Sequence, residues 1–266
     1  GLIFTDALNM KGVSKYYGPG EVELISLIAG NDVMEFAEDV PKAMELIRQA
    51  VNDGRISQAE IDKRCLKVLN AKAWFGLDKY KPIDLNNLTA DLNNSTAKAV
   101  DNKLVENSLT LLVNKNTLPI KNLDKGRIAS FVIGDELGGT FQNTLSQYTS
   151  VDHFALNNGA SEAEYYAILN VLKKYEKVIV SVHNLSTSRS KNYGITQQLL
   201  NVFAELSFST QLTVNVFGNP YALGRLPGIE HANALLFSYR KSKTAERLAA
   251  QAIFGGVAVS GKLPVT

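Results

Sequence analysis

The stretch Lys177-Val-Ile-Val-Ser-Val-His183 is a nearly continuous apolar run that ends in polar residues, with Asn184 directly after it. Runs of this kind are typical of strands in a parallel sheet that helices cover on both faces. Similar runs occur at 128–134, 151–156, 212–218 and 234–239, and helical patterns separate them at 139–148, 161–175, 196–206 and 244–254. This alternation predicts an α/β fold over residues 97–266, an α/β/α sandwich with a mostly parallel, five-stranded sheet.

Polar residues follow three of these predicted strands. They are Gly134-Asp135-Glu136, His183-Asn184 and Gly218-Asn219-Pro220. Ligands of open α/β sheets bind outside the carboxyl ends of the strands, so these segments are candidate site residues. His183 and Glu136 are the groups that could act as acid or base. The plainer alternatives are that His183 bonds to backbone at the strand end and that Glu136 is solvated in a loop.

The first part of the chain, residues 1–77, has a different pattern of apolar residues. It predicts a strand at 1–5, a helix at 21–29, a strand at 32–36 and helices at 40–52 and 57–75. Two strands alone cannot form a sheet that is buried on both faces, and a (β/α)8 barrel takes about 250 residues. We therefore expect the C-terminal part of such a barrel, completed by a segment that precedes residue 1. Residues 78–96 are polar and aperiodic, which predicts a linker.

Composition excludes several classes of function. The sequence contains 28 Lys and Arg residues and 26 Asp and Glu residues, which gives a net charge of +2. Because no dense basic run occurs, nucleic acid is not an expected partner. The single cysteine, Cys65, rules out an intramolecular disulfide framework and a cysteine-rich zinc site. The three histidines are far apart in sequence and have no metal-ligand spacing, so no metal site is expected.

The segment Gly1–Val13 carries the clearest chemical signal. Its apolar strand delivers Thr5 and Asp6 at the carboxyl end, which is the catalytic face in barrel enzymes. A carboxylate there can act as nucleophile, general base or metal ligand. Alternatively, Asp6 caps the helical turn that follows. The spacing alone leaves both possibilities open.

The run Phe4-Thr-Asp-Ala-Leu-Asn-Met-Lys-Gly12 resembles the nucleophile motif of family 3 of the glycoside hydrolases, in which a strand ends in Ser/Thr-Asp. Other landmarks of that family recur in the same order along the chain. The segments that resemble these landmarks are residues 29–34, 56–77, 108–120 and 259–266. The resemblance implies a barrel followed by an α/β sandwich.

The resemblance also implies roles for residues. Asp6 matches the catalytic nucleophile, and Met10 matches a residue that lines the sugar pocket in the β-N-acetylglucosaminidase (β-hexosaminidase) branch. Ala7 stands where the β-glucosidase branch tends to have Trp. The loop 183–193 contains no carboxylate where that branch has its acid/base Glu. In the β-N-acetylglucosaminidase branch the acid/base is a His on a barrel loop upstream of the nucleophile. That loop would precede residue 1, so the resemblance implies that residues 1–266 alone would be inactive.

The implied activity is the retaining hydrolysis of terminal β-linked N-acetylglucosamine, without metal or cofactor. The substrate would be a glycan such as a cell-wall fragment, and the location would be the bacterial envelope or periplasm. A β-glucosidase or exo-glucanase of the same family, a non-catalytic glycan-binding or packing module, and a flavodoxin-like nucleotide binder are the alternatives. Nucleotide is not expected, because the Walker-like run 256–262 is followed by Leu263 and lacks the hydroxyl residue.

Overall fold

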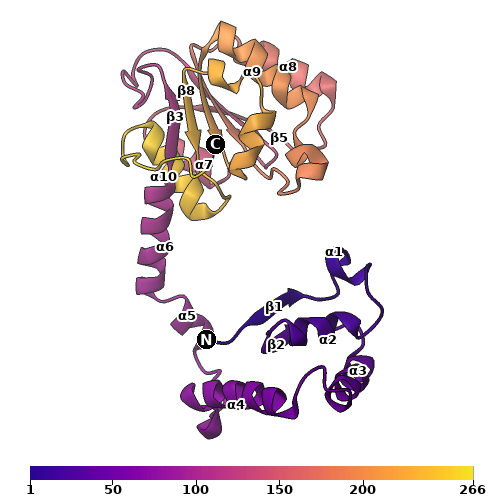
Figure 1. The fold of residues 1–266 in the computed structure, drawn as a ribbon. Coiled ribbons are helices and arrows are strands. Elements are labelled where there is room, and N and C mark those ends of the chain that lie inside the picture. The colour runs from indigo at the N-terminus through magenta and orange to yellow at the C-terminus, as the bar shows by residue number, and fades with distance from the viewer. Residues whose placement is uncertain (266) are drawn as a thin grey trace. The chain divides into compact units, whose positions relative to one another are not determined.

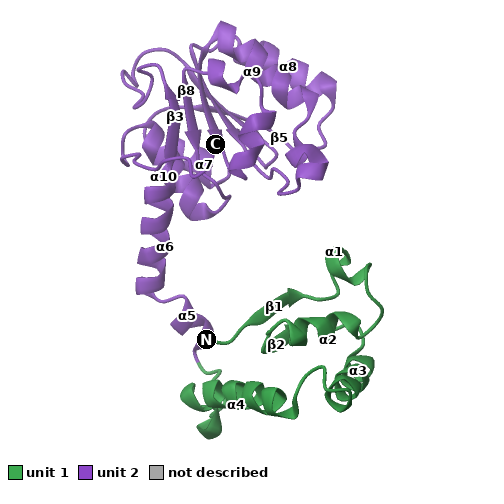
Figure 2. Cartoon of the chain, in the orientation of Figure 1, with its two compact units in different colours: residues 1–86 green, residues 87–266 purple. Residues whose placement is uncertain are grey.

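The computed structural model describes residues 1–265, so Thr266, the last residue of the predicted sandwich and of the closing motif, lies outside it. The chain forms two compact units, residues 1–86 and the residues from Asn87 onward (Figure 2). Within residues 1–265, no helix combines the length and the apolar character that a membrane crossing requires.

The first unit follows the predicted order of strand, helix, strand and helix. Its strands β1 (Phe4–Ala7) and β2 (Val33–Glu35) pair in parallel. The helices are α1 (Lys11–Ser14), α2 (Glu21–Ile28), α3 (Val40–Asn52) and α4 (Gln58–Trp74), followed by the short 3-10 helix η1 (Leu77–Lys79). Asp39 and Ser57 begin α3 and α4, because each side chain accepts a hydrogen bond from a free backbone N–H of the first turn.

The side chain of Asp32, just before β2, bonds to residues near β1 and in α4. Its Oδ2 accepts the backbone N–H of Ile3 at 2.7 Å, just before β1, and the ammonium of Lys67 in α4 at 2.6 Å. The Asp32 side chain is only 3% exposed. The hydrogen bond from Lys67, followed by the one from Ile3, lowers the pKa of this carboxyl below its ordinary value. The ionised carboxylate therefore fixes where β1, the turn before β2 and α4 meet.

The second unit contains a mixed sheet. Helices α5 (Leu88–Leu92) and α6 (Ser95–Ser108) precede it. Its strands are β3 (Thr110–Asn114), β4 (Ile128–Ile133), β5 (Asp152–Leu156), β6 (Lys177–Val182), β7 (Gln211–Val216) and β8 (Ala234–Phe237). The order across the sheet is β3-β8-β7-β6-β4-β5. The α/β fold is confirmed.

The predicted count of five strands is wrong, because the described part of the sheet has six. The additional strand, β3, lies at the edge and runs antiparallel to β8, whereas all other neighbouring pairs are parallel. An edge strand pairs on one side only and stays partly exposed, as β3 does over Leu111–Asn114. It therefore lacks the fully buried apolar run that marks the central strands.

Helices cover both faces of this sheet, as Figure 1 shows. On one face, α8 (Glu162–Leu172) and α9 (Gln197–Ser209) bury their apolar stripes. On the other face lie α6, α7 (Thr140–Leu145) and α10 (Lys243–Ile253). Three 3-10 helices, η2 (Arg189–Gly194), η3 (Pro220–Arg225) and η4 (Ile229–His231), follow β6 and β7.

The strand order reverses between β4 and β6. From β4 the chain crosses to β5 on one side, and β6 then returns to the other side of β4. The two strand ends lie close together here: a Cβ on Gly134, whose φ is +85°, would meet the backbone O of His183 at 2.5 Å. The Nδ2 of Asn184 donates to the backbone O of Gly134 at 2.6 Å. Such a reversal is where doubly wound sheets bind ligands.

We predict that Leu169→Ala lowers the free energy of unfolding of the second unit by about 2–5 kcal/mol, because it opens a cavity in a core that cannot fully collapse. Leu169 in α8 is 1% exposed and packs against the sheet. Val171→Ala in the same helix is the matched control, since Val171 is 38% exposed. Urea unfolding followed by circular dichroism measures both variants, and equal losses would contradict the assignment of α8's buried face.

We also predict that the contact made by Asp32 weakens in acid. A carboxyl with a lowered folded pKa stabilises the fold above its unfolded pKa of about 3.9, and that contribution is lost as the pH falls through the folded value. The amide protection factor of Ile3 should therefore drop in this range, and Asp32→Asn should show low protection already at pH 7. Asp53→Asn, an exposed ion-pair partner of Arg55, should leave it unchanged.

Candidate functional site

Asp6 lies within β1, one residue before the end of that strand. The strand runs from Phe4 to Ala7 and not, as predicted, from residue 1 to 5. The side chain of Asp6 is exposed, and its Oδ1 accepts the backbone N–H of Ala7 at 2.7 Å. The N-cap of α1 is Met10, so the alternative that Asp6 caps this helix is wrong. Asp6 is an ionisable group at the carboxyl end of a parallel strand.

Met10 lies in the turn that leaves β1. Its backbone N–H donates to the backbone O of Ala7 at 3.2 Å, and its side chain is 53% exposed. The turn thus places Asp6 and Met10 on the same strand-to-helix connection. An exposed apolar side chain and an exposed carboxylate are each suited to a sugar ring, which offers C–H faces as well as hydroxyls.

The neighbouring strand β2 is fixed against this connection by two hydrogen bonds. The backbone N–H of Glu35 donates to Oγ1 of Thr5 at 3.0 Å, and the backbone N–H of Leu8 donates to the backbone O of Glu35 at 3.0 Å. These bonds hold the backbone on both sides of Asp6 in place. A carboxylate held in this way can act as nucleophile, as general base or as an electrostatic partner of a cationic transition state.

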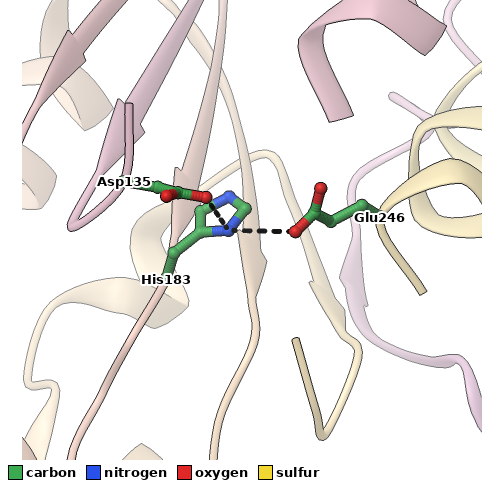
Figure 3. Close-up of side chains that lie close together, drawn as sticks. All are labelled: Asp135, His183 and Glu246. Carbon is green, nitrogen blue, oxygen red and sulfur yellow. Dashed lines mark ion pairs between the residues drawn. The ribbon is translucent and has the colours of Figure 1, made fainter. Parts of the chain in front are cut away.

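A second group of ionisable side chains lies close together in the other unit, at the reversal between β4 and β6. Asp135 follows β4, His183 follows β6 and Glu246 lies in α10 (Figure 3). Nδ1 of His183 is 3.7 Å from Oδ2 of Asp135 and 3.9 Å from Oε1 of Glu246. Lys241 joins the group, since its Nζ is 2.6 Å from the same Asp135 oxygen.

The ring of His183 is buried beside two aromatic rings. Its side chain is 1% exposed, and its ring lies between Phe217, at 4.5 Å between ring centroids, and Phe141, at 6.2 Å. Burial lowers the pKa of the imidazole to about 4, although the Asp135 carboxylate opposes this shift. The ring is therefore neutral at neutral pH. Nε2 is 3.0 Å from Oγ of Ser181, and Nδ1 has no hydrogen-bond partner within the described structure.

The two carboxyls of this cluster differ in their surroundings. Burial raises the pKa of Glu246, against the opposing effect of the Lys241 cation. Burial also acts to raise the pKa of Asp135, but the hydrogen bond from Lys241 and one from the backbone N–H of Glu136 outweigh it, so that pKa lies below its ordinary value. Asp135 thus carries the charge that balances Lys241, while Glu246 is the more readily protonated group.

The sequence identified part of this cluster. The strand-end rule pointed to Asp135 and His183, which the structure brings together. His183 bonds through its ring to the Ser181 side chain, where backbone was expected, and Glu136 is not part of the cluster. Glu246 was missed. It shares the spacing of the buried residues Ala249, Ala250 and Ile253 in α10, and a carboxylate on an apolar helix face is a signal that could have revealed it.

Residues 1–71 match the family model described as "Glycosyl hydrolase family 3 N terminal domain". No curated protein sequence matches the chain. Among solved structures, the fold is similar to that of a glycoside hydrolase family 3 beta-N-acetylglucosaminidase from Paenibacillus sp. str. FPU-7. That match has 22% identity and a TM-score of 0.72, and it covers 99% of this chain and 51% of that one.

Two further structural neighbours have other activities. The beta-glucoside phosphorylase BglX has 19% identity and a TM-score of 0.74, with coverage of 100% of this chain and 49% of that one. A beta-glucosidase from Listeria innocua in complex with isofagomine has 17% identity and a TM-score of 0.73, with coverage of 96% and 39%. The chain therefore spans about half the length of these neighbours or less, and at such identities the likeness concerns the fold alone. The family model thus matches the first 71 residues, and these neighbours share the fold over nearly the whole chain.

Proposed function

We propose that this chain functions as part of a retaining glycoside hydrolase that removes terminal β-linked N-acetylglucosamine from glycans such as cell-wall fragments. The observation that carries the proposal is the position of Asp6. It is an exposed carboxylate at the carboxyl end of a parallel strand, inside the segment that matches the model of the family 3 N-terminal domain. In barrel enzymes this end of the strands is the catalytic face.

In the proposed reaction Asp6 is the nucleophile. Its carboxylate attacks the anomeric carbon, the glycosidic C–O bond breaks, and a covalent glycosyl-enzyme forms. A second group protonates the departing oxygen and then takes a proton from the water that hydrolyses the intermediate, which releases Asp6 as a carboxylate. We assign this second role to a His held by an Asp on a barrel segment outside residues 1–266. No metal or cofactor takes part.

The surface of the first unit supports a barrel partner. Apolar side chains on β1, α2 and α4 are about half exposed within this unit: Phe4, Ile28, Leu66 and Leu69. A strand and helices of a complete barrel bury such side chains against neighbouring strands and helices. Further β/α units of the same barrel would cover them and would bring the acid/base beside Asp6.

Two features favour N-acetylglucosamine over glucose. Ala7 follows Asp6 where the β-glucosidase branch tends to have Trp, and the loop of residues 183–193 contains no carboxylate that could serve as that branch's acid/base. The Paenibacillus neighbour is a beta-N-acetylglucosaminidase. Because other neighbours act on β-glucosides, a β-glucosidase is the second candidate function. A comparison of the two substrates distinguishes the two candidates.

We predict that Asp6→Asn in the full-length enzyme lowers kcat for an aryl β-N-acetylglucosaminide by ~10³-fold or more, because the amide cannot form the glycosyl-enzyme. Asp78→Asn, at an exposed position of η1, is the matched control and should retain wild-type turnover. With a slowly hydrolysed activated glycoside, peptide mass spectrometry should find the sugar on the peptide that contains Asp6. Unchanged turnover of Asp6→Asn would exclude the nucleophilic role.

We predict that Met10→Ala raises KM for the aryl β-N-acetylglucosaminide about tenfold and leaves the weak cleavage of the aryl β-glucoside nearly unchanged. Loss of one apolar contact in a pocket typically changes discrimination by about 10–200-fold. Steady-state kinetics on both substrates measures the effect, with Met44→Ala, on the exposed side of α3, as control. A wild-type enzyme that prefers the glucoside would favour the second candidate.

A further inference from the structure

We propose that Asp135, His183 and Glu246 form a binding site for a divalent transition-metal cation of the Zn²⁺ type. The site lies at the carboxyl edge of the sheet in the second unit, where the strand order reverses between β4 and β6. It belongs to the second compact unit, whereas Asp6 belongs to the first, and it has no role in the proposed glycosidase reaction.

Three different elements supply the candidate ligands. The loop after β4 provides Asp135, the end of β6 provides His183, and α10 provides Glu246; Figure 3 shows both carboxylates directed at the same ring nitrogen. The three ligand atoms all lie within 4.8 Å of one another. Metal–ligand bonds of about 2.0–2.2 Å place ligand atoms about 3–3.5 Å apart. A modest inward movement of the two carboxylates would close the site.

The unpartnered nitrogen of His183 is the observation that points to a ligand. Nδ1 belongs to a side chain that is 1% exposed, and it has no hydrogen-bond partner among the described residues. Buried polar atoms are nearly always paired, because an unpaired one loses its bond to water without replacement. Here the atom faces two carboxylates at 3.7 and 3.9 Å, which is too far for a hydrogen bond. A cation between the three groups would give this nitrogen the partner that it lacks.

The other ring nitrogen supports the same inference. Nε2 of His183 lies 3.0 Å from Oγ of Ser181, a buried hydroxyl on β6. When Nε2–H donates to this hydroxyl, Nδ1 carries the free lone pair that a metal requires. Metal-binding histidines generally have their second nitrogen fixed by such a partner.

The donor set suits particular cations. One imidazole nitrogen with two carboxylate oxygens is typical of Zn²⁺ and related divalent transition metals, whereas Ca²⁺ and Mg²⁺ prefer oxygen alone. Three protein ligands leave at least one coordination position for water or another small ligand. A bound cation would link β4, β6 and α10 at the edge where these elements converge.

The ammonium of Lys241 would compete with a metal cation for the carboxylate of Asp135. Its ammonium is 2.6 Å from Oδ2 of Asp135, and its side chain is 32% exposed, so it can move into solvent when a metal binds. Removal of this positive charge should therefore strengthen metal binding. This expectation separates the proposal from a purely structural role of the cluster, in which loss of Lys241 would only leave Asp135 without its partner.

The test is Zn²⁺ binding by the untagged, full chain, measured by equilibrium dialysis and by thermal unfolding. We expect one bound Zn²⁺ per chain and a rise in Tm on the order of 5–10 °C at a hundredfold excess over Kd. His183→Ala should weaken binding by at least a hundredfold, and Lys241→Met should tighten it about tenfold. With Co²⁺ as a spectroscopic probe, visible absorption should appear in the wild-type chain and vanish in His183→Ala.

Two further variants keep the test decisive. Glu246→Gln preserves the size of the side chain and should also weaken binding, so the outcome does not rest on the folding of one buried-site variant. His231→Ala is the matched control, because His231 forms a surface pair with Glu230 at the same 3.9 Å distance. The proposal is overturned if the wild-type chain does not bind Zn²⁺, or if His183→Ala binds it as tightly as wild type and His231→Ala do.

Discussion

The ladder of parallel strands that is buried on both faces is the constraint on which the second unit depends. In β4 and β6 every residue is buried, so their backbone groups can be satisfied only by neighbouring strands. Apolar side chains then fill both faces, and helices must cover them. Ionisable groups of these strands that need water or a ligand therefore lie at the strand ends, as Asp135 and His183 do.

The two faces of this sheet differ in a way that matters for the cluster. The face under α8 and α9 is apolar, whereas the face under α7 and α10 also buries hydroxyl and amide groups. Oγ of Ser238 donates to Oδ1 of Asn215 at 2.7 Å, and Nε2 of Gln142 donates to the backbone O of Phe154 at 3.0 Å. On the same face, Ser181 is the register partner of Asn215, and its Oγ lies 3.0 Å from Nε2 of His183. A buried imidazole is tolerated here because its neighbours include groups that can bond to it.

Both units place carboxylates at the carboxyl ends of parallel strands, but their surroundings give them different chemistry. Asp6 is exposed and is free to meet a substrate from solution. Asp135 and Glu246 lie beside a buried neutral ring and a lysine, where each charge needs a partner. The first arrangement suits nucleophilic attack. The second suits the holding of a cation, and it would stiffen the edge of the sheet rather than react.

The sequence by itself determined the local elements and the class of fold. The helix over 40–52 and the central strands followed from periodicity, because burial on one helix face or on both strand faces selects side chains directly. The strand-end rule and the family resemblance marked Asp6, Asp135 and His183. Tertiary structure alone decided that β3 joins the sheet antiparallel to β8, and that Glu246 from α10 meets residues more than sixty positions away. Such pairings depend on how helices and strands pack, and no local pattern of side chains encodes them.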